Sequence, residues 1–299
     1  MDKNIRGFLK YISLERHYSK HTAESYSNDL LQFETFLHRT FDTRTIKWER
    51  VDKNIIRIFL NELSELELSR RSIARKLAAL KSFFKFLTRE EITDQNPAIS
   101  IKLPRFEKKL PEFVTLDEIK KIIKLPEIRT FEGLRDLAIL ELFYGTGLRL
   151  SELINLETAN IEFDENLLRV RGKGNKIRII PLGSAAKKII EQYLEYRPQY
   201  AQNSVENIFV LKSGKKMYPM AVQRIVRKYL DQVTHVKQKS PHLFRHTYAT
   251  HLLNAGASIR VVKDLLGHES LSTTQVYTHL SVDYLKETYR RAHPGASEK

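Results

Sequence analysis

Four side chains that could act on a phosphodiester lie within one short stretch of the sequence, residues 240–280. His242 and Arg245 are three residues apart, so on a helix both would face the same small target. An arginine fork matches a phosphate through two hydrogen bonds, and an imidazole such as that of His268 can donate to the same oxygens. A tyrosine hydroxyl becomes a nucleophile when positive neighbours favour its ionised form. With Tyr277 as that tyrosine, the stretch predicts nucleophilic attack on a phosphodiester.

Apolar periodicity predicts the helices that would bring these groups together. Residues 242–254 carry a helical stripe of apolar side chains. A second helix is expected over residues 258–266, where a glycine ends it and leaves His268 beside a turn. A third, short helix is expected to begin at Ser272 and would carry Tyr277.

Two motifs earlier in the chain could supply further positive groups. The sequence G-T-G-L-R places Arg149 where a helix begins after a tight turn, and both its guanidinium and that helix terminus favour an anion. Glu152, one turn later, is expected to orient Arg149. Residues 166–182 are typical of two strands joined by G-K-G-N-K, which would place Lys173 and Lys176 at a hairpin tip. Taken singly, a surface arginine and a solubilising lysine are the commoner explanations.

Together these motifs, in this order and spacing, resemble the tyrosine recombinase (integrase) family, and most closely its Xer-type members. The resemblance is carried by G-T-G-L-R-x-S-E-L, G-K-G-N-K, H-L-F-R-H, L-L-G-H and V-Y-T-H-L, and it extends over nearly the whole chain. It selects Lys173 over Lys176. The active-site residues that it implies are Arg149, Lys173, His242, Arg245, His268 and Tyr277.

The resemblance also implies a mechanism. Tyr277 would attack a DNA phosphate, form a 3′-phosphotyrosine and release a 5′-hydroxyl, while Lys173 would protonate the leaving 5′-oxygen. His242 would accept the tyrosine proton or assist its transfer. The groups that would stabilise the charge on the phosphorane are Arg149, Arg245 and His268. Because such groups can do the work of a metal ion, no metal or other cofactor is expected, and no P-loop motif for a nucleotide occurs in the sequence.

The charge of the chain predicts a polyanionic partner. Its 299 residues include 51 Lys and Arg against 36 Asp and Glu, a formal net charge of +15, and the excess is spread over residues 1–110 and 111–299 alike. Nucleic acid is the favoured partner. The absence of cysteine excludes disulfides and a cysteine nucleophile. No apolar run approaches the about 20 residues of a membrane span, and the N-terminus does not resemble a signal peptide, so a cytoplasmic location is expected.

Periodicity and a proline-containing basic linker predict two domains and a mainly α fold. Residues 1–102 are expected to form a domain of four helices, and residues 103–111 an extended linker. Four helices at these places resemble the N-terminal core-DNA-binding domain of the same family. Residues 112–299 are expected to form a mainly helical catalytic domain with a small antiparallel β-sheet.

One predicted helix of the first domain has the charge pattern of a DNA-binding surface. From Ser69 through Thr88 it carries six basic residues and no acidic one, whereas a solvated helix normally mixes both signs. A solvated surface is the alternative for any single residue. The expected DNA contacts are Arg70, Arg71, Arg75 and Lys76.

The resemblance implies a double-stranded DNA recombination site as substrate and a homo- or hetero-tetramer of recombinases on two duplexes. It leaves open whether a DNA translocase takes part. A last helix carrying Val282, Leu285 and Tyr289 would dock on a neighbouring protomer or fold onto its own domain.

Xer-type resolution of chromosome or plasmid dimers at cell division is the favoured function. An integrase of a mobile element shares all the chemistry, and a type IB topoisomerase also uses tyrosine and arginines. A DNA-binding module without catalysis would lack a catalytic residue, and none of the six is missing.

Overall fold

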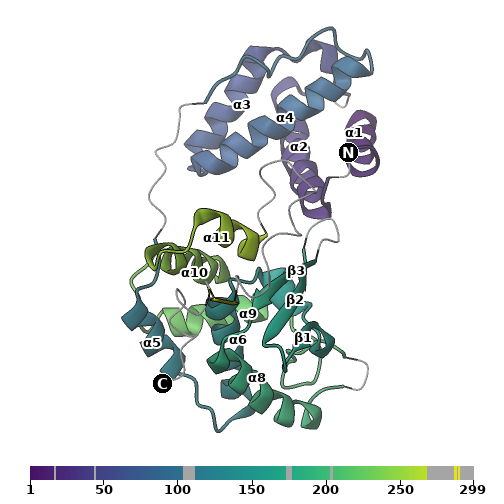
Figure 1. The fold of residues 1–299 in the computed structure, drawn as a ribbon. Coiled ribbons are helices and arrows are strands. Elements are labelled where there is room, and N and C mark those ends of the chain that lie inside the picture. The colour runs from purple at the N-terminus through teal and green to yellow at the C-terminus, as the bar shows by residue number, and fades with distance from the viewer. Residues whose placement is uncertain are drawn as a thin grey trace. The chain divides into compact units, whose positions relative to one another are not determined.

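The computed structural model describes residues 1–16, 18–43, 45–103, 112–172, 177–202, 205–267, 286–287 and 289, with the side chains of Lys20 and His21 left aside. The chain divides into two compact units, Met1–Lys109 and Leu110–Lys299 (Figure 1). Both units are mainly helical, and the second contains a small antiparallel sheet. The predicted fold class is therefore confirmed.

Within its described residues, the first unit consists of four α-helices and one 3₁₀ turn. They are α1 (Lys3–Leu14), α2 (Lys20–Phe41), η1 (Trp48–Arg50), α3 (Lys53–Glu65) and α4 (Arg70–Arg89). Side-chain caps set where the helices begin: Asp52 accepts from the backbone N–H of Ile55, and Ser69 from that of Ser72.

Aromatic rings fill the core of the first unit. Trp48 is almost completely buried and meets Phe83 edge to face, with 4.9 Å between ring centroids. Its indole N–H donates to Asp2 at 3.1 Å. Because Asp2 also caps α1, this one contact holds the start of the chain against the core formed by the later helices.

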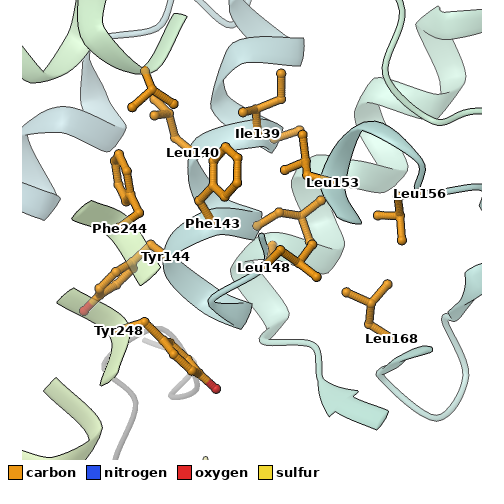
Figure 2. Close-up of a cluster of buried hydrophobic side chains, with 14 of the residues drawn as sticks. Ile139, Leu140, Phe143, Tyr144, Leu148, Leu153, Leu156, Leu168, Phe244 and Tyr248 are labelled. Carbon is orange, nitrogen blue, oxygen red and sulfur yellow. The ribbon is translucent and has the colours of Figure 1, made fainter. Parts of the chain in front are cut away.

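The second unit surrounds a buried helix, α6 (Phe131–Thr146). Its apolar residues point to most sides, and it packs against α8 and α10. Figure 2 shows the resulting cluster, in which Phe143 and Tyr144 of α6 lie near Phe244 and Tyr248 of α10. The other elements are α5 (Leu116–Lys124), α7 (Leu150–Ile154), η2 (Thr158–Asn160), α8 (Ser184–Tyr196), η4 (Arg197–Gln199), α9 (Pro219–Leu230), α10 (Pro241–Asn254) and α11 (Ile259–Leu266).

The sheet of the second unit includes the predicted hairpin. Its strands are β1 (Ile161–Glu162), β2 (Leu167–Arg171) and β3 (Ile177–Pro181), all antiparallel in the order β1-β2-β3. Arg171 pairs with Ile177, so residues 172–176 connect the two long strands. Residues 173–176 of this connection, Lys173 among them, lie outside the described residues.

Three residues of the predicted last helix are described, and they contact the second unit of the same chain. Tyr289 is buried in the core of that unit. Lys286 pairs with Glu165, with 3.1 Å between Nζ and Oε2. In this single chain, Lys286 and Tyr289 therefore pack onto their own domain, whereas Val282 and Leu285 lie outside the described residues. Within the described residues, no helix is both long enough and apolar enough to span a membrane.

The backbone conformation of Gly147 and its surroundings both disfavour a side chain at this position. It ends α6 in the left-handed region, with φ +62°, and a Cβ atom there would lie 2.6 Å from Cδ1 of Tyr248. We expect Gly147→Ala to lower the free energy of unfolding by about 2 to 5 kcal/mol, through backbone strain and a steric clash together. Urea denaturation measures the change.

Gly256 supplies the matched control. It also has a positive φ, +89°, but a Cβ there would meet nothing within 4 Å. Gly256→Ala should therefore cost only the strain, about 1 to 3 kcal/mol. Equal losses at the two positions would contradict the proposed clash with α10.

Candidate active site

Three of the six predicted active-site residues lie within the described part of the chain: Arg149, His242 and Arg245. Arg149 is the N-cap of α7, directly after the turn that ends α6. Its backbone N–H donates to Oε2 of Glu152 at 2.7 Å, and its Nη1 donates to Oε1 at 2.8 Å. The predicted contact between these two residues is confirmed. The other three, Lys173, His268 and Tyr277, lie outside the described residues.

Arg245 and His242 occupy the first turns of α10 but differ in exposure. Arg245 is only 8% exposed, whereas His242 is exposed at the start of the helix. The Nη1 of Arg245 donates to the backbone oxygen of Gly147 at 2.5 Å, and its Nη2 donates to that of Leu266. The arginine is thus held between the turn after α6 and the end of α11.

Three successive carbonyl groups at the end of α11 each accept a hydrogen bond from a different arginine. Arg178 Nε donates to Leu265 at 2.9 Å, Arg245 to Leu266, and Arg149 Nη2 to Gly267 at 2.9 Å. The last carbonyls of a helix lack partners within the helix and carry its negative partial charge, so they suit cationic donors. Gly267 makes the turn that ends the helix, with φ +65°. The three guanidinium groups therefore bind the three residues that directly precede His268 in the sequence.

The electrostatics of this cluster favour an anion. Burial, and next the nearby Arg149, lower the pKa of Arg245 to about 10, so the group stays protonated at neutral pH. Burial would by itself raise the pKa of Glu152, but hydrogen bonds and charge from Arg178 and from Arg149 outweigh it and lower the pKa to about 2. Three guanidinium groups against one carboxylate leave a positive excess at this place, which suits a phosphate.

Arg178 belongs to this cluster but was not among the residues predicted from the sequence. It lies on β3, where the pattern I-R-I-I-P places a charged residue between apolar ones. Since alternate residues of a strand face opposite sides, an arginine in the buried register was the available signal. This signal was easily overlooked because several other lysines and arginines occur in the same hairpin.

The predicted DNA contacts on α4 differ in their surroundings. Arg70 and Arg71 are exposed at its start. Lys76 is buried, and its Nζ lies 2.8 Å from Oδ1 of the buried Asp29 on α2. Arg75 is exposed, but its guanidinium pairs with the same carboxylate.

The position of Lys76 has a reason in the helical period. It follows Ile73 by three residues and precedes Leu77, so it falls on the apolar side of α4, where a charge needs a buried partner. Lys76 therefore ties α4 to α2. The structure favours Arg70 and Arg71 as the residues that face outward.

The acid side of the stability curve tests the role of Glu152. A carboxylate with a lowered pKa contributes stability above its unfolded value of 4.5, and the contribution is lost as the pH falls toward the folded value of about 2. Glu152→Gln should therefore lower the free energy of unfolding at pH 7 by about 3 kcal/mol. The deficit should narrow between pH 4.5 and 2, as measured by urea denaturation at each pH.

Glu195→Gln, at an exposed position of α8, is the control and should reproduce the wild-type profile. A Glu152→Gln deficit that is constant from neutral to acid pH would show that the carboxylate charge is not what stabilises the cluster.

Comparison with known proteins shows which family the chain belongs to. The sequence matches the phage integrase family over residues 112–283 and the N-terminal SAM-like domain of phage integrases over residues 5–91. It is 41% identical over 306 residues to the tyrosine recombinase XerC of Syntrophus aciditrophicus, with 99% of each chain covered. It is 39% identical over 317 residues to the XerC of Chlorobaculum parvum, covering 98% of this chain and 94% of that relative.

Solved structures of the same fold include recombinases bound to DNA. The XerH site-specific recombinase in a pre-cleavage complex with its difH substrate has a TM-score of 0.70 at 21% identity, over 95% of this chain and 83% of XerH. The Tn1549 transposon integrase with a circular intermediate DNA has a TM-score of 0.69 at 20% identity, over 89% and 91%. Both domains match, and the similarity to the XerC proteins extends over nearly the full length of the chain. The chain therefore belongs to the phage integrase family of tyrosine recombinases, which are DNA strand-exchange enzymes.

Proposed function

We propose that this chain is a site-specific recombinase that resolves chromosome or plasmid dimers at cell division, and that it cuts DNA through a 3′-phosphotyrosine at Tyr277. The observation that supports this most directly is the meeting of three guanidinium groups at the end of α11. Such a cluster costs free energy to assemble because like charges repel. A bound phosphate would offset that cost.

Arg149 and Arg245 are the proposed ligands of the non-bridging phosphate oxygens. The side chain of Arg149 is 34% exposed, which leaves it accessible to a duplex, whereas Arg245 is buried. Both are held by protein oxygens before DNA binds, so little reorganisation is needed when charge develops on the phosphorane. His268 is the proposed third donor.

The proposed reaction exchanges one phosphorus–oxygen bond for another. The Tyr277 oxygen bonds to phosphorus as the bond to the 5′-oxygen breaks, and Lys173 gives that oxygen its proton. His242, exposed at the start of α10, takes the tyrosine proton. Because the phosphotyrosine conserves the energy of the diester, a 5′-hydroxyl of another strand can religate it. We therefore propose that the reaction requires neither a metal ion nor a nucleotide.

The proposed assembly is a tetramer of recombinases, of one or two kinds, on two duplexes in the cytoplasm. Residues 1–102 would bind the core of the site, residues 112–299 would carry out catalysis, and the linker 103–111 would follow the DNA backbone. The positive charge of both parts supports this division. A DNA translocase as an activating partner is part of the same hypothesis.

Integration of a mobile element is the second candidate. The likeness to the Tn1549 integrase supports it, but at 20% identity this concerns the fold, whereas the XerC relatives share 41% and 39% of their residues. The greater sequence similarity favours dimer resolution.

To test the nucleophile, a duplex substrate is first selected from a randomised DNA library with the wild-type protein. The selected duplex is then nicked close to the scissile phosphate, so that cleavage traps the covalent adduct. Tyr277→Phe should abolish the covalent adduct, since it lacks the attacking oxygen, and should leave affinity near wild type. Denaturing electrophoresis and peptide sequencing of the adduct measure the first, and a gel shift measures the second.

Tyr218→Phe is the matched control, since Tyr218 is an exposed tyrosine of the same unit and should keep full adduct formation. An adduct that persists in Tyr277→Phe, or that maps to another residue, would refute the proposed nucleophile.

The salt dependence of binding tests the proposed contacts on α4. Each phosphate contact contributes about 0.9 to the slope of log affinity against log salt. The Arg70→Ala, Arg71→Ala double variant should therefore bind more weakly and show a slope shallower by up to about 2.

The Arg39→Ala, Arg89→Ala double variant removes the same charge from exposed side chains that pair with acidic neighbours in the same unit. Its slope should remain that of the wild type. If both double variants change the slope equally, the effect comes from net charge and the contacts on α4 are not specific.

A further inference from the structure

Arg178 is a buried arginine that the proposed reaction does not use. Its side chain is 7% exposed, on β3 directly after the connection that carries Lys173. An arginine is seldom buried unless its charge is paired, because removing it from water costs several kcal/mol. Its contacts therefore indicate what its burial achieves.

All three guanidinium nitrogens of Arg178 donate to protein oxygens. Nη1 and Nη2 donate to the two carboxylate oxygens of Glu152, at 2.7 and 2.8 Å. Nε donates to the backbone oxygen of Leu265 at 2.9 Å. A paired fork of this kind fixes the orientation of the carboxylate as well as its position. Each of the three guanidinium nitrogens of Arg178 is thus held by an oxygen of the protein.

The same carboxylate also binds Arg149. Oε1 of Glu152 accepts from Arg149 Nη1 at 2.8 Å, and Oε2 accepts from its backbone N–H at 2.7 Å. Glu152 thus lies between the two arginines, and its orientation by Arg178 sets where the guanidinium of Arg149 lies.

Arg178 also supports the turn that leads to His268. A Cβ atom at Gly267 would lie 3.1 Å from Cδ of Arg178, so the turn that ends α11 packs closely on this side chain. With the bond to Leu265, the arginine therefore holds the end of α11 against β3.

We infer that Arg178 is a positioning residue for DNA cleavage, which acts on Arg149 through Glu152 and on the chain before His268 through Leu265. This inference rests on the proposed function. It predicts that loss of Arg178 weakens the stabilisation of phosphate charge more than it weakens DNA binding.

A substrate without phosphate charge separates positioning from general stability. Replacing one non-bridging oxygen of the scissile phosphate by a methyl group gives a neutral methylphosphonate, which depends less on a well-placed arginine. Adduct formation is therefore measured on two nicked duplexes of the selected sequence, one with a phosphodiester and one with a methylphosphonate. The ratio of the two rates does not depend on how much of the protein is folded.

Arg178→Met should slow adduct formation on the phosphodiester by about 10- to 100-fold, the range typical for residues that orient a functional group from behind. It should slow the methylphosphonate reaction less, so the ratio of rates should fall, and affinity for the duplex should stay near wild type. Arg178→Lys keeps a positive charge but cannot reach both Glu152 and Leu265. It should lower the ratio less, and it decides the question if Arg178→Met does not fold.

Arg169→Met is the matched control, because Arg169 is an exposed arginine of the same hairpin that pairs with Glu162. It should keep the wild-type ratio. A folded Arg178 variant that slows both substrates by the same factor would overturn the inference and make Arg178 purely structural. If the wild type forms no adduct on the phosphodiester, the proposed function itself fails, which is a separate result.

Discussion

The described part of the active site depends on hydrogen bonds between the end of one helix and three arginines. The last carbonyl groups of α11 have no partners within the helix, and each accepts from a guanidinium that comes from a different element. Arg149 begins α7, Arg178 lies on β3, and Arg245 lies on α10. Helix α11 thus links parts of the second unit that are far apart in sequence, and the residue that follows these carbonyls is His268.

Burial of charge makes this arrangement specific. A guanidinium removed from water must find acceptors, and here the acceptors are few and fixed, so each arginine has one well-defined position. Glu152 stays ionised among them, and its lowered pKa reflects the two arginines that bind it. A phosphate diester would neutralise part of the positive charge that remains. Arg149 and Arg245, the two arginines proposed to bind that phosphate, are each held in place by oxygens of the protein.

In the first unit, paired charges also position structural elements, in this case two helices. Asp29 is buried between α2 and α4 and pairs with Lys76 and Arg75. A buried carboxylate with two cationic partners fixes how the helices pack, while Arg70 and Arg71 remain exposed. One basic helix thus contributes both to the core of its domain and to the surface proposed to bind DNA.

The sequence by itself determined the fold class, most helix limits and the family. Helical periodicity, side-chain caps and glycine stops act over a few residues, so the ends of α4 and α11 and the contact between Arg149 and Glu152 could be predicted from neighbours in the chain. The partners of Arg178 and Lys76 could not, because Leu265 and Asp29 are distant in sequence and meet them only through packing. A charged residue in an apolar register indicates burial, but the sequence does not show which carboxylate or carbonyl group will pair with it. Only the tertiary structure decides, because it determines which charges lose their water and must be paired within the protein.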